Sequence, residues 1–325
     1  MKRVLLAQPR GFCAGVDRAV DIIDELLRNA GETVYVRKEV VHNRVVVEGF
    51  RQRGAIFVDE LDQVPAGSLV VYSAHGVSPE VRERAKDLRL HSIDATCPLV
   101  TKVHREVRRF IDAGCRVVLI GHAGHEEVEG TMGHGYGNIA LIQNEDEARA
   151  FQHAGPEPLA IVSQTTLAVS DVRRIIEILQ ERFGNVELPP VSDICYATEN
   201  RQNAVRALAP HCEAVIVVGS ANSSNSRSLR DVAEQLGARG YLTDDPAAIR
   251  AEWLAGVTTL GVTAGASSPE GLVEAVIARV RELDPEFVTV EPFGQSEPPM
   301  TFRPPKEFTD LLATVGAGET RAQAG

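Results

Sequence analysis

Three cysteines, each placed directly before a predicted helix, divide the chain into similar segments. Cys13 begins "CAGVDRAV", Cys97 begins "CPLVTKVH" and Cys195 begins "CYATENRQ". Each helix leads to a short apolar strand, and each strand ends in a polar loop 28 or 29 residues after its cysteine. Because a single insertion would destroy this agreement, we interpret the pattern as an internal repeat.

Each segment contains two polar loops at the ends of predicted strands. The first loops contribute His42, His125, Glu127, Ser223, Ser224 and Asn225, and the second loops contribute His75, Thr165 and Ser267. Groups that bind ligands gather beyond the carboxyl ends of parallel strands. Three such units around a pseudo-threefold axis would direct the cysteines and all six loops toward one central cavity.

Short apolar strands alternate with helices, which is typical of parallel sheets covered on both faces. We expect strands at 2–7, 33–40, 69–74, 115–121, 139–143, 159–163, 213–218 and 258–263. Helices are predicted at 14–30, 44–53, 79–88, 98–113, 171–183, 198–209, 226–237 and 269–283. The fold class is therefore α/β, with three similar domains in a trefoil at 1–96, 97–193 and 194–284. Residues 285–325 are expected to wrap the surface, and their last stretch, "GAGETRAQAG", is predicted to be disordered.

Composition excludes several kinds of protein. Lys and Arg number 34 against 45 Asp and Glu, a net charge of −11 that does not suit a nucleic-acid phosphate backbone. Apolar runs such as "VIVV" are too short to cross a membrane. The apolar part of "MKRVLLAQPR" is too short for an export signal. We therefore expect a cytoplasmic protein with reduced thiols and no nucleic-acid or membrane partner.

The five cysteines separate into two groups. Cys115 and Cys212 each begin a predicted strand and are interpreted as packing residues. The other three precede helices, and three converging thiolates indicate a metal site. Structural zinc takes four protein ligands, whereas an iron–sulfur cluster held by three cysteines leaves one iron open. Three buried cysteines with no metal remain the alternative at this point.

The polar loops suit a phosphate or diphosphate, because they supply histidines, hydroxyls and the amides of helix N-termini. Structural histidines and helix N-caps are the alternative for the same residues. The three acids of "GHEEVEG" include a candidate proton donor with Thr165 in reach. "GHGYG" lacks the six-residue dinucleotide fingerprint, so electrons would come from a partner protein.

The chain closely resembles the 4-hydroxy-3-methylbut-2-enyl diphosphate reductase family over about residues 2–284. The matching motifs are "PRGFCAGV", "VHN", "SAHGV", "DATCPLV", "GHEEVEGTMG", "SQTTL", "ICYAT", "RQ", "VGSANSSNS" and "TAGASSP". The resemblance implies a trefoil around a central [4Fe–4S] cluster with Cys13, Cys97 and Cys195 as its ligands. It implies diphosphate contacts from His42, His75, His125, Ser223, Ser224, Asn225 and Ser267.

The resemblance also implies a reaction, the reductive dehydroxylation that yields isopentenyl and dimethylallyl diphosphates. It selects Glu127 among the three acids as the proton donor, and it places Thr165 near the substrate hydroxyl. A ferredoxin or a flavodoxin-type protein would supply the electrons. Ala221 departs from the family, because many relatives carry Lys there.

Two other functions remain open from the sequence. A three-cysteine cluster dehydratase or condensing enzyme, such as quinolinate synthase, would use its iron without net reduction. A non-catalytic thiol or zinc-binding protein would be colourless.

Overall fold

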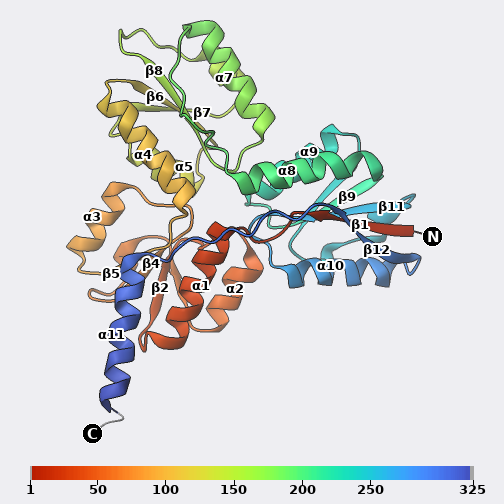
Figure 1. The fold of residues 1–325 in the computed structure, drawn as a ribbon, viewed down its shortest axis with the longest axis horizontal. Coiled ribbons are helices and arrows are strands. Elements are labelled where there is room, and N and C mark those ends of the chain that lie inside the picture. Colours follow the sequence, from red (N-terminus) through yellow and green to blue (C-terminus); the bar gives the residue numbers. More distant parts are fainter. Residues whose placement is uncertain (1, 323–325) are drawn as a thin grey trace.

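Three lobes meet near the centre of the molecule in the computed structural model, which describes residues 2–322, with side chains through Thr314 (Figure 1). Each lobe is built on one sheet whose strands are all parallel. The strand orders are β3-β2-β4-β5, β7-β6-β8 and β10-β9-β11-β1-β12. The predicted α/β class with three similar units is confirmed.

The first lobe contains the four-stranded sheet. Its elements are α1 (Ala14–Asn29), β2 (Val34–Arg37), α2 (Arg44–Gln52), β3 (Ile56–Val58), the 3-10 helix η1 (Leu61–Gln63), β4 (Leu69–Tyr72), α3 (Pro79–Asp87) and β5 (His91–Asp94). Polar side chains begin two of its helices, because Asn43 accepts a hydrogen bond from the Val46 amide and Ser78 accepts one from the Val81 amide.

The second lobe contains the three-stranded sheet. Its elements are α4 (Pro98–Asp112), β6 (Arg116–Ile120), α5 (Glu126–Gly133), β7 (Ile139–Ile142), α6 (Glu145–Ala150), β8 (Leu159–Ser163) and α7 (Val169–Phe183). The third lobe contains α8 (Tyr196–Leu208), η2 (Ala209–His211), β9 (Ala214–Val218), α9 (Ser224–Gln235), β10 (Arg239–Thr243), η3 (Pro246–Ala248), η4 (Ala251–Leu254), β11 (Thr259–Ala264), α10 (Glu270–Leu283) and β12 (Phe287–Gly294).

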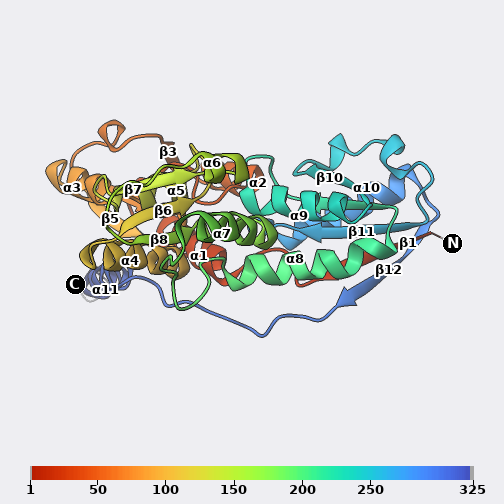
Figure 2. The ribbon, with the colours of Figure 1, turned by 90° about the horizontal axis from the view of Figure 1, so that it is seen from above.

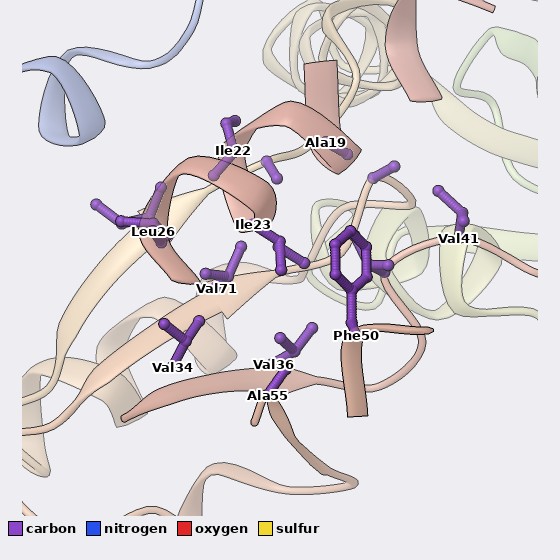
Figure 3. Packing of buried hydrophobic residues seen from close by; sticks show 14 of the residues in the cluster. Ala19, Ile22, Ile23, Leu26, Val34, Val36, Val41, Phe50, Ala55 and Val71 are labelled. Carbon is purple, nitrogen blue, oxygen red and sulfur yellow. The ribbon is translucent and has the colours of Figure 1, made fainter. Parts of the chain in front are cut away.

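Each lobe has its own apolar core between sheet and helices. In the first lobe, Ile22, Ile23 and Leu26 of α1 pack onto Val36 and Val71 of the sheet (Figure 3). The interior strands β4, β6 and β9 are runs of buried apolar residues rich in Val, as is typical of parallel sheets covered on both faces. These cores keep the strand ends rigid, and the polar loops begin at those ends.

Four strands that the sequence reading missed are all edge strands: β3, β5, β10 and β12. Most of their residues are exposed or half-buried, so these strands lack the long buried apolar run of a central strand. The helix α5 was also missed, because its sequence "EEVEGTMG" contains two glycines and no apolar periodicity.

The first strand belongs to a different sheet from the one expected. β1 (Lys2–Gln8) was predicted inside the unit at 1–96, but it pairs with β11 and β12 in the third sheet. Its buried residue Val4 packs in the core of the third lobe. The chain therefore crosses between lobes immediately before Cys13. The boundaries after residues 96 and 193 stay predictions.

The C-terminal segment also differs in part from the expectation. After β12 it runs in an extended path along the outside of the molecule to the first lobe, where α11 (Lys306–Ala322) begins (Figure 2). The helix includes residues 316–322, which were predicted to be disordered, and residues 323–325 lie outside the described part. Phe308, Leu311 and Leu312 pack against the core around α1, and this contact stabilises the start of the helix. Among residues 2–322, no helix combines the length and the apolar character that crossing a membrane requires.

Candidate active site

The three predicted cysteine ligands occupy equivalent positions at helix N-termini. Cys13, Cys97 and Cys195 are the N-cap residues of α1, α4 and α8. The positive ends of three helix dipoles therefore lie beside three sulfur atoms. This arrangement favours negative charge on the sulfurs or on a group that they bind.

Gly15 shows how closely two of the sulfurs approach. A Cβ atom at this position would lie 2.6 Å from Cys97 Sγ and 3.9 Å from Cys13 Sγ. Residue 15 must therefore be a glycine for α1 to begin beside α4. The Cys97 side chain fills the place that a side chain at residue 15 would take, so the cysteines of two different lobes come close together here.

The thiols are held in a setting where they stay protonated by themselves. Burial, with nearby Cys13, raises the pKa of Cys97 to about 12, and burial raises the pKa of Cys195 to about 11. Burial also raises the pKa of Cys13. Thiolates at these positions need a cationic partner, because several buried negative charges repel one another. The donor set fits a metal-containing group bound through three sulfurs.

Three imidazoles form a compact cluster next to the cysteines. The rings of His42 and His75 are stacked with centroids 4.0 Å apart, and the ring of His125 stands edge-on at 5.0 Å from His42. His42 comes from the loop after β2, His75 from the loop after β4 and His125 from the loop after β6. The cluster therefore joins the first and second lobes.

Hydrogen bonds at Nδ1 fix how these rings face the cavity. Glu39 accepts from Nδ1 of His42 and Glu126 accepts from Nδ1 of His75, each at 3.1 Å. Nδ1 of His125 accepts from the Glu127 amide at 3.1 Å, so the neutral ring carries its proton on Nε2. The Nε2 atoms of His42 and His125 are buried and have no hydrogen-bond partner within the described residues.

Two of the three imidazoles, those of His75 and His125, are weak bases in this buried setting. Burial and the neighbouring imidazoles lower the pKa of His125 to about 2, and burial with the His42 charge lowers the pKa of His75. Ligand atoms of His42, His75 and Glu126 lie within 4.8 Å of one another, a spacing that also permits a metal ion. The hydrogen bonds from His42 to Glu39 and from His75 to Glu126 account for this arrangement without a metal ion.

Glu127 and Thr165 form a buried pair between α5 and the loop after β8. The Thr165 amide donates to Oε1 of Glu127 at 2.7 Å, and the Thr165 hydroxyl donates to Oε2 at 3.1 Å. The Glu127 side chain is only 2% exposed. Burial raises the pKa of Glu127 to about 7, although both hydrogen bonds from Thr165 oppose the rise. Glu127 is therefore the acid of this loop that can exchange a proton near neutral pH.

The third lobe supplies hydroxyl and amide groups. Ser223 is the N-cap of α9, and its Oγ accepts from the Ser226 amide. The alternative interpretation of this serine as a helix N-cap is therefore also correct. Ser267 donates from Oγ to the His42 carbonyl at 3.0 Å. Asn225 accepts from the Ala266 amide at 2.9 Å.

All twelve predicted site residues line one cavity. These residues are Cys13, His42, His75, Cys97, His125, Glu127, Thr165, Cys195, Ser223, Ser224, Asn225 and Ser267. Cys115 and Cys212 lie elsewhere, in the core of the second lobe and against an apolar cluster of the third. The convergence predicted from the repeat is therefore present in the structure, while the roles of the individual residues stay predictions.

Comparison with known proteins gives the same result from the whole sequence. Residues 4–281 match the model of the LytB protein family. The chain belongs to the LytB family.

The chain aligns with curated LytB relatives over nearly their full lengths. The chain is 53% identical to "4-hydroxy-3-methylbut-2-enyl diphosphate reductase" of Bordetella pertussis, over 95% of each chain. It is 51% identical to the protein of the same name from Aeromonas hydrophila, over 95% of this chain and 99% of that one. The family resemblance read from the motifs is confirmed.

A solved LytB structure has the same fold. The structure of E-1-hydroxy-2-methyl-but-2-enyl-4-diphosphate reductase from Plasmodium falciparum superposes with a TM-score of 0.93 at 34% identity, covering 96% of this chain and 98% of that one. A second solved structure, of (E)-4-hydroxy-3-methyl-but-2-enyl diphosphate reductase, superposes with a TM-score of 0.61 at 32% identity. The match covers 87% of this chain and 100% of that one. The computed fold is thus that of solved LytB structures.

Sequence reasoning missed several residues that support the LytB site. Glu39 and Glu126 orient two histidines, and Thr198 contacts the Cys195 sulfur. Arg201, in the motif "RQ", is fully buried and donates to the carbonyls of Gly11 and Phe12, just before Cys13. The sequence did offer a signal for Arg201, because it is a charged residue inside the helix that begins after Cys195.

A wider cavity of about 810 Å³ adjoins the site and shares His42 and His125 with it. Lys38, Arg51 and Arg227 line it together with acidic side chains. Lys38 is 3.4 Å from Glu129, whereas Arg227 forms no ion pair with any residue whose side chain is described. A free guanidinium therefore lies beside the histidine cluster.

Proposed function

We propose that this protein removes the hydroxyl group of 4-hydroxy-3-methylbut-2-enyl diphosphate reductively, forming isopentenyl diphosphate and dimethylallyl diphosphate. The observation that carries the proposal is the convergence of three cysteines, three histidines and Glu127 on one cavity in a LytB chain. The names of the relatives support the same substrate.

We infer that Cys13, Cys97 and Cys195 hold a [4Fe–4S] cluster through their thiolates. Three cysteines leave one iron without a protein ligand, and the bound cluster would supply Lewis acidity at that iron and relay the donor's electrons one at a time. The helix N-termini at all three cysteines stabilise its negative charge.

The histidine cluster and the third-lobe hydroxyls would bind the diphosphate. Nε2 of His125 is a buried donor without a partner among the described residues, and an anion arriving at His75 would favour its protonated form. Ser223, Ser224, Asn225 and Ser267 add neutral donors at the N-terminus of α9 and in the loop after β11. Binding this charge in a buried site holds the rest of the substrate in one orientation.

Glu127 and Thr165 would deliver a proton to the leaving hydroxyl group. The hydroxyl leaves as water only when a proton reaches its oxygen. Oε1 of Glu127 accepts from the Thr165 amide, so a protonated Glu127 would carry its proton on Oε2 and donate it to the Thr165 hydroxyl oxygen, which reverses the direction that this hydrogen bond has in the carboxylate form. Thr165 can pass this proton toward a substrate hydroxyl in the same cavity. The full reaction consumes two electrons and two protons for each water released.

The electrons would come from another protein, of the ferredoxin or flavodoxin type. The chain contains no dinucleotide fingerprint with which to bind its own nicotinamide or flavin. A small-molecule diphosphate and an electron-donor protein are therefore the two partners that we propose.

An anaerobic assay with dithionite and a viologen mediator tests this proposal. The protein should be brown, contain iron and sulfide in the ratio of a [4Fe–4S] cluster, and oxidise the mediator only when the hydroxylated diphosphate is added. A dehydratase would convert the substrate without oxidising the mediator. A colourless, zinc-containing protein would overturn the cluster and the reaction together.

A further inference from the structure

A chain of hydrogen bonds connects the side chain of Asn225 with the sulfur of Cys195. Asn225 donates from Nδ2 to Thr198 Oγ1 at 3.3 Å, and Thr198 Oγ1 lies 3.1 Å from Cys195 Sγ. The Thr198 amide donates to the same sulfur at 3.3 Å. Thr198 is fully buried, so water does not compete for these contacts.

This contact distinguishes Cys195 from the other two cysteines. Within the described residues, only Cys195 among the three has a side-chain hydroxyl within hydrogen-bond distance of its sulfur. Near Cys97, the hydroxyl of Thr101 donates to the backbone carbonyl of Cys97 at 3.3 Å and not to its sulfur. The sulfur environments of the three cysteines are therefore unequal.

The direction of the contact depends on whether Cys195 is a thiol or a thiolate. A thiol can donate to Thr198 Oγ1, but a thiolate bound to a metal has no proton and can only accept. The Thr198 hydroxyl must then donate to Cys195 Sγ. Hydrogen bonds to cluster sulfurs stabilise the more negative, reduced state and raise the reduction potential.

The orientation of the Asn225 amide follows from its other neighbour. The Ala266 amide donates to Oδ1 of Asn225 at 2.9 Å, so Nδ2 must be the end that faces Thr198. The amide carries a second hydrogen on Nδ2, and Asn225 lines the cavity beside Ser223, Ser224 and Ser267. One amino group thus touches both Thr198 and the region proposed for the diphosphate.

We propose that Thr198 is a positioning residue that sets the reduction potential of the cluster through Cys195, and that Asn225 makes this potential responsive to an anion in the diphosphate site. The inference rests on the proposed function, because it requires the cluster. No covalent step is involved, only a change in hydrogen bonding to one ligand sulfur.

The test compares Thr198→Val with Thr198→Ser in the anaerobically purified full-length protein. Valine keeps the branched shape and the amide but removes the hydroxyl, whereas serine keeps the hydroxyl. Thr101→Val is the matched control, since its hydroxyl does not reach a sulfur. Reduction potentials are measured by mediated titration with electron paramagnetic resonance, with and without inorganic diphosphate.

At the wild-type midpoint potential, we expect the ratio of reduced to oxidised cluster to fall about tenfold in Thr198→Val, a shift of about 59 mV for one electron. In Thr198→Ser and Thr101→Val, the ratio of reduced to oxidised cluster should stay within twofold of the wild-type ratio. Inorganic diphosphate should shift the potential of the wild type and of Thr198→Ser, but not that of Thr198→Val.

An unchanged potential in a Thr198→Val protein with a full cluster would overturn the inference and leave the proposed function intact. A wild type without a cluster would instead overturn the proposed function. If Thr198→Val cannot hold a cluster, the Asn225→Ala variant tests the coupling instead, because it leaves the contact between Thr198 and the Cys195 sulfur in place. In that variant, a potential that still responds to saturating inorganic diphosphate would contradict the coupling.

Discussion

Glu297 accepts a hydrogen bond at 3.1 Å from the guanidinium of Arg201, a side chain with no exposed surface. Glu297 lies in the extended segment after β12, and it also accepts from Asn200 at 3.0 Å. Arg201 in turn holds the carbonyls that precede Cys13. The C-terminal segment is thereby attached to the loop that carries one of the proposed cluster ligands.

Replacing Glu297 by Gln should lower the free energy of unfolding by about 2 kcal/mol, because a buried guanidinium loses its charged partner. Glu291→Gln is the control, since Glu291 and Arg3 form an exposed pair at 3.6 Å whose loss should cost less than about 1 kcal/mol. Denaturant unfolding of both variants measures the difference. Equal effects would show that Glu297 contributes no more than a surface charge.

Glu127→Gln should lower kcat by about 10²- to 10⁴-fold, the usual loss when a positioned proton donor is removed. Its cluster content and its affinity for the diphosphate should stay close to those of the wild type. Glu129→Gln, a change at an exposed position of the same helix, is the control and should keep full activity. Wild-type turnover in Glu127→Gln would exclude Glu127 as the proton donor.

The pH dependence of kcat/KM should reflect the raised pKa of Glu127, about 7. Because the protonated carboxyl is the active form, kcat/KM should fall about tenfold for each pH unit above 7. Glu127 should also contribute to stability below its ordinary pKa of 4.5, and this contribution is lost as the pH rises through about 7. Unfolding measured from pH 4.5 to 8 should show that loss in the wild type and not in Glu127→Gln.

Gly15→Ala should reduce the iron and sulfide content to less than about a tenth of the wild-type value, because the new Cβ would lie 2.6 Å from Cys97 Sγ. Gly49→Ala provides a matched helical control, since a Cβ there meets nothing within 4 Å. That control should keep its iron and gain about 0.5–1 kcal/mol of stability from the better helix former. A fully loaded Gly15→Ala protein would argue against a group bound between Cys13 and Cys97.

Arg227→Gln should raise KM for the diphosphate about fivefold and weaken its dependence on ionic strength, because a guanidinium without a partner attracts the approaching anion. Arg230→Gln, on the same helix but paired with Asp231 at 2.6 Å, is the control. Steady-state assays at low and high salt measure both effects. If the two variants had the same KM, Arg227 would have no part in substrate binding.

The internal repeat makes the site predictable from the sequence alone. Cys13, Cys97 and Cys195 stand at equal places in three similar segments, and parallel strands bring their following loops to one edge. The edge strands β3, β5, β10 and β12 were not predictable in the same way, because most of their residues are exposed or half-buried and do not form the apolar run that marks a buried strand. The position of β1 in the third sheet depends on pairing between residues more than 250 positions apart, which local sequence patterns do not encode.

The sequence by itself determined the kinds of chemistry available: which thiols, imidazoles and acids the chain carries, and that helices begin at three of its cysteines. Only the tertiary structure decided which of these groups are buried away from water and which form hydrogen bonds with other residues. Glu126 and Glu127 are neighbours in sequence, yet one accepts from His75 while the other is buried against Thr165. Burial and hydrogen bonding set the pKa of each carboxyl, and both arise from contacts with other lobes or strands that adjacent residues do not share.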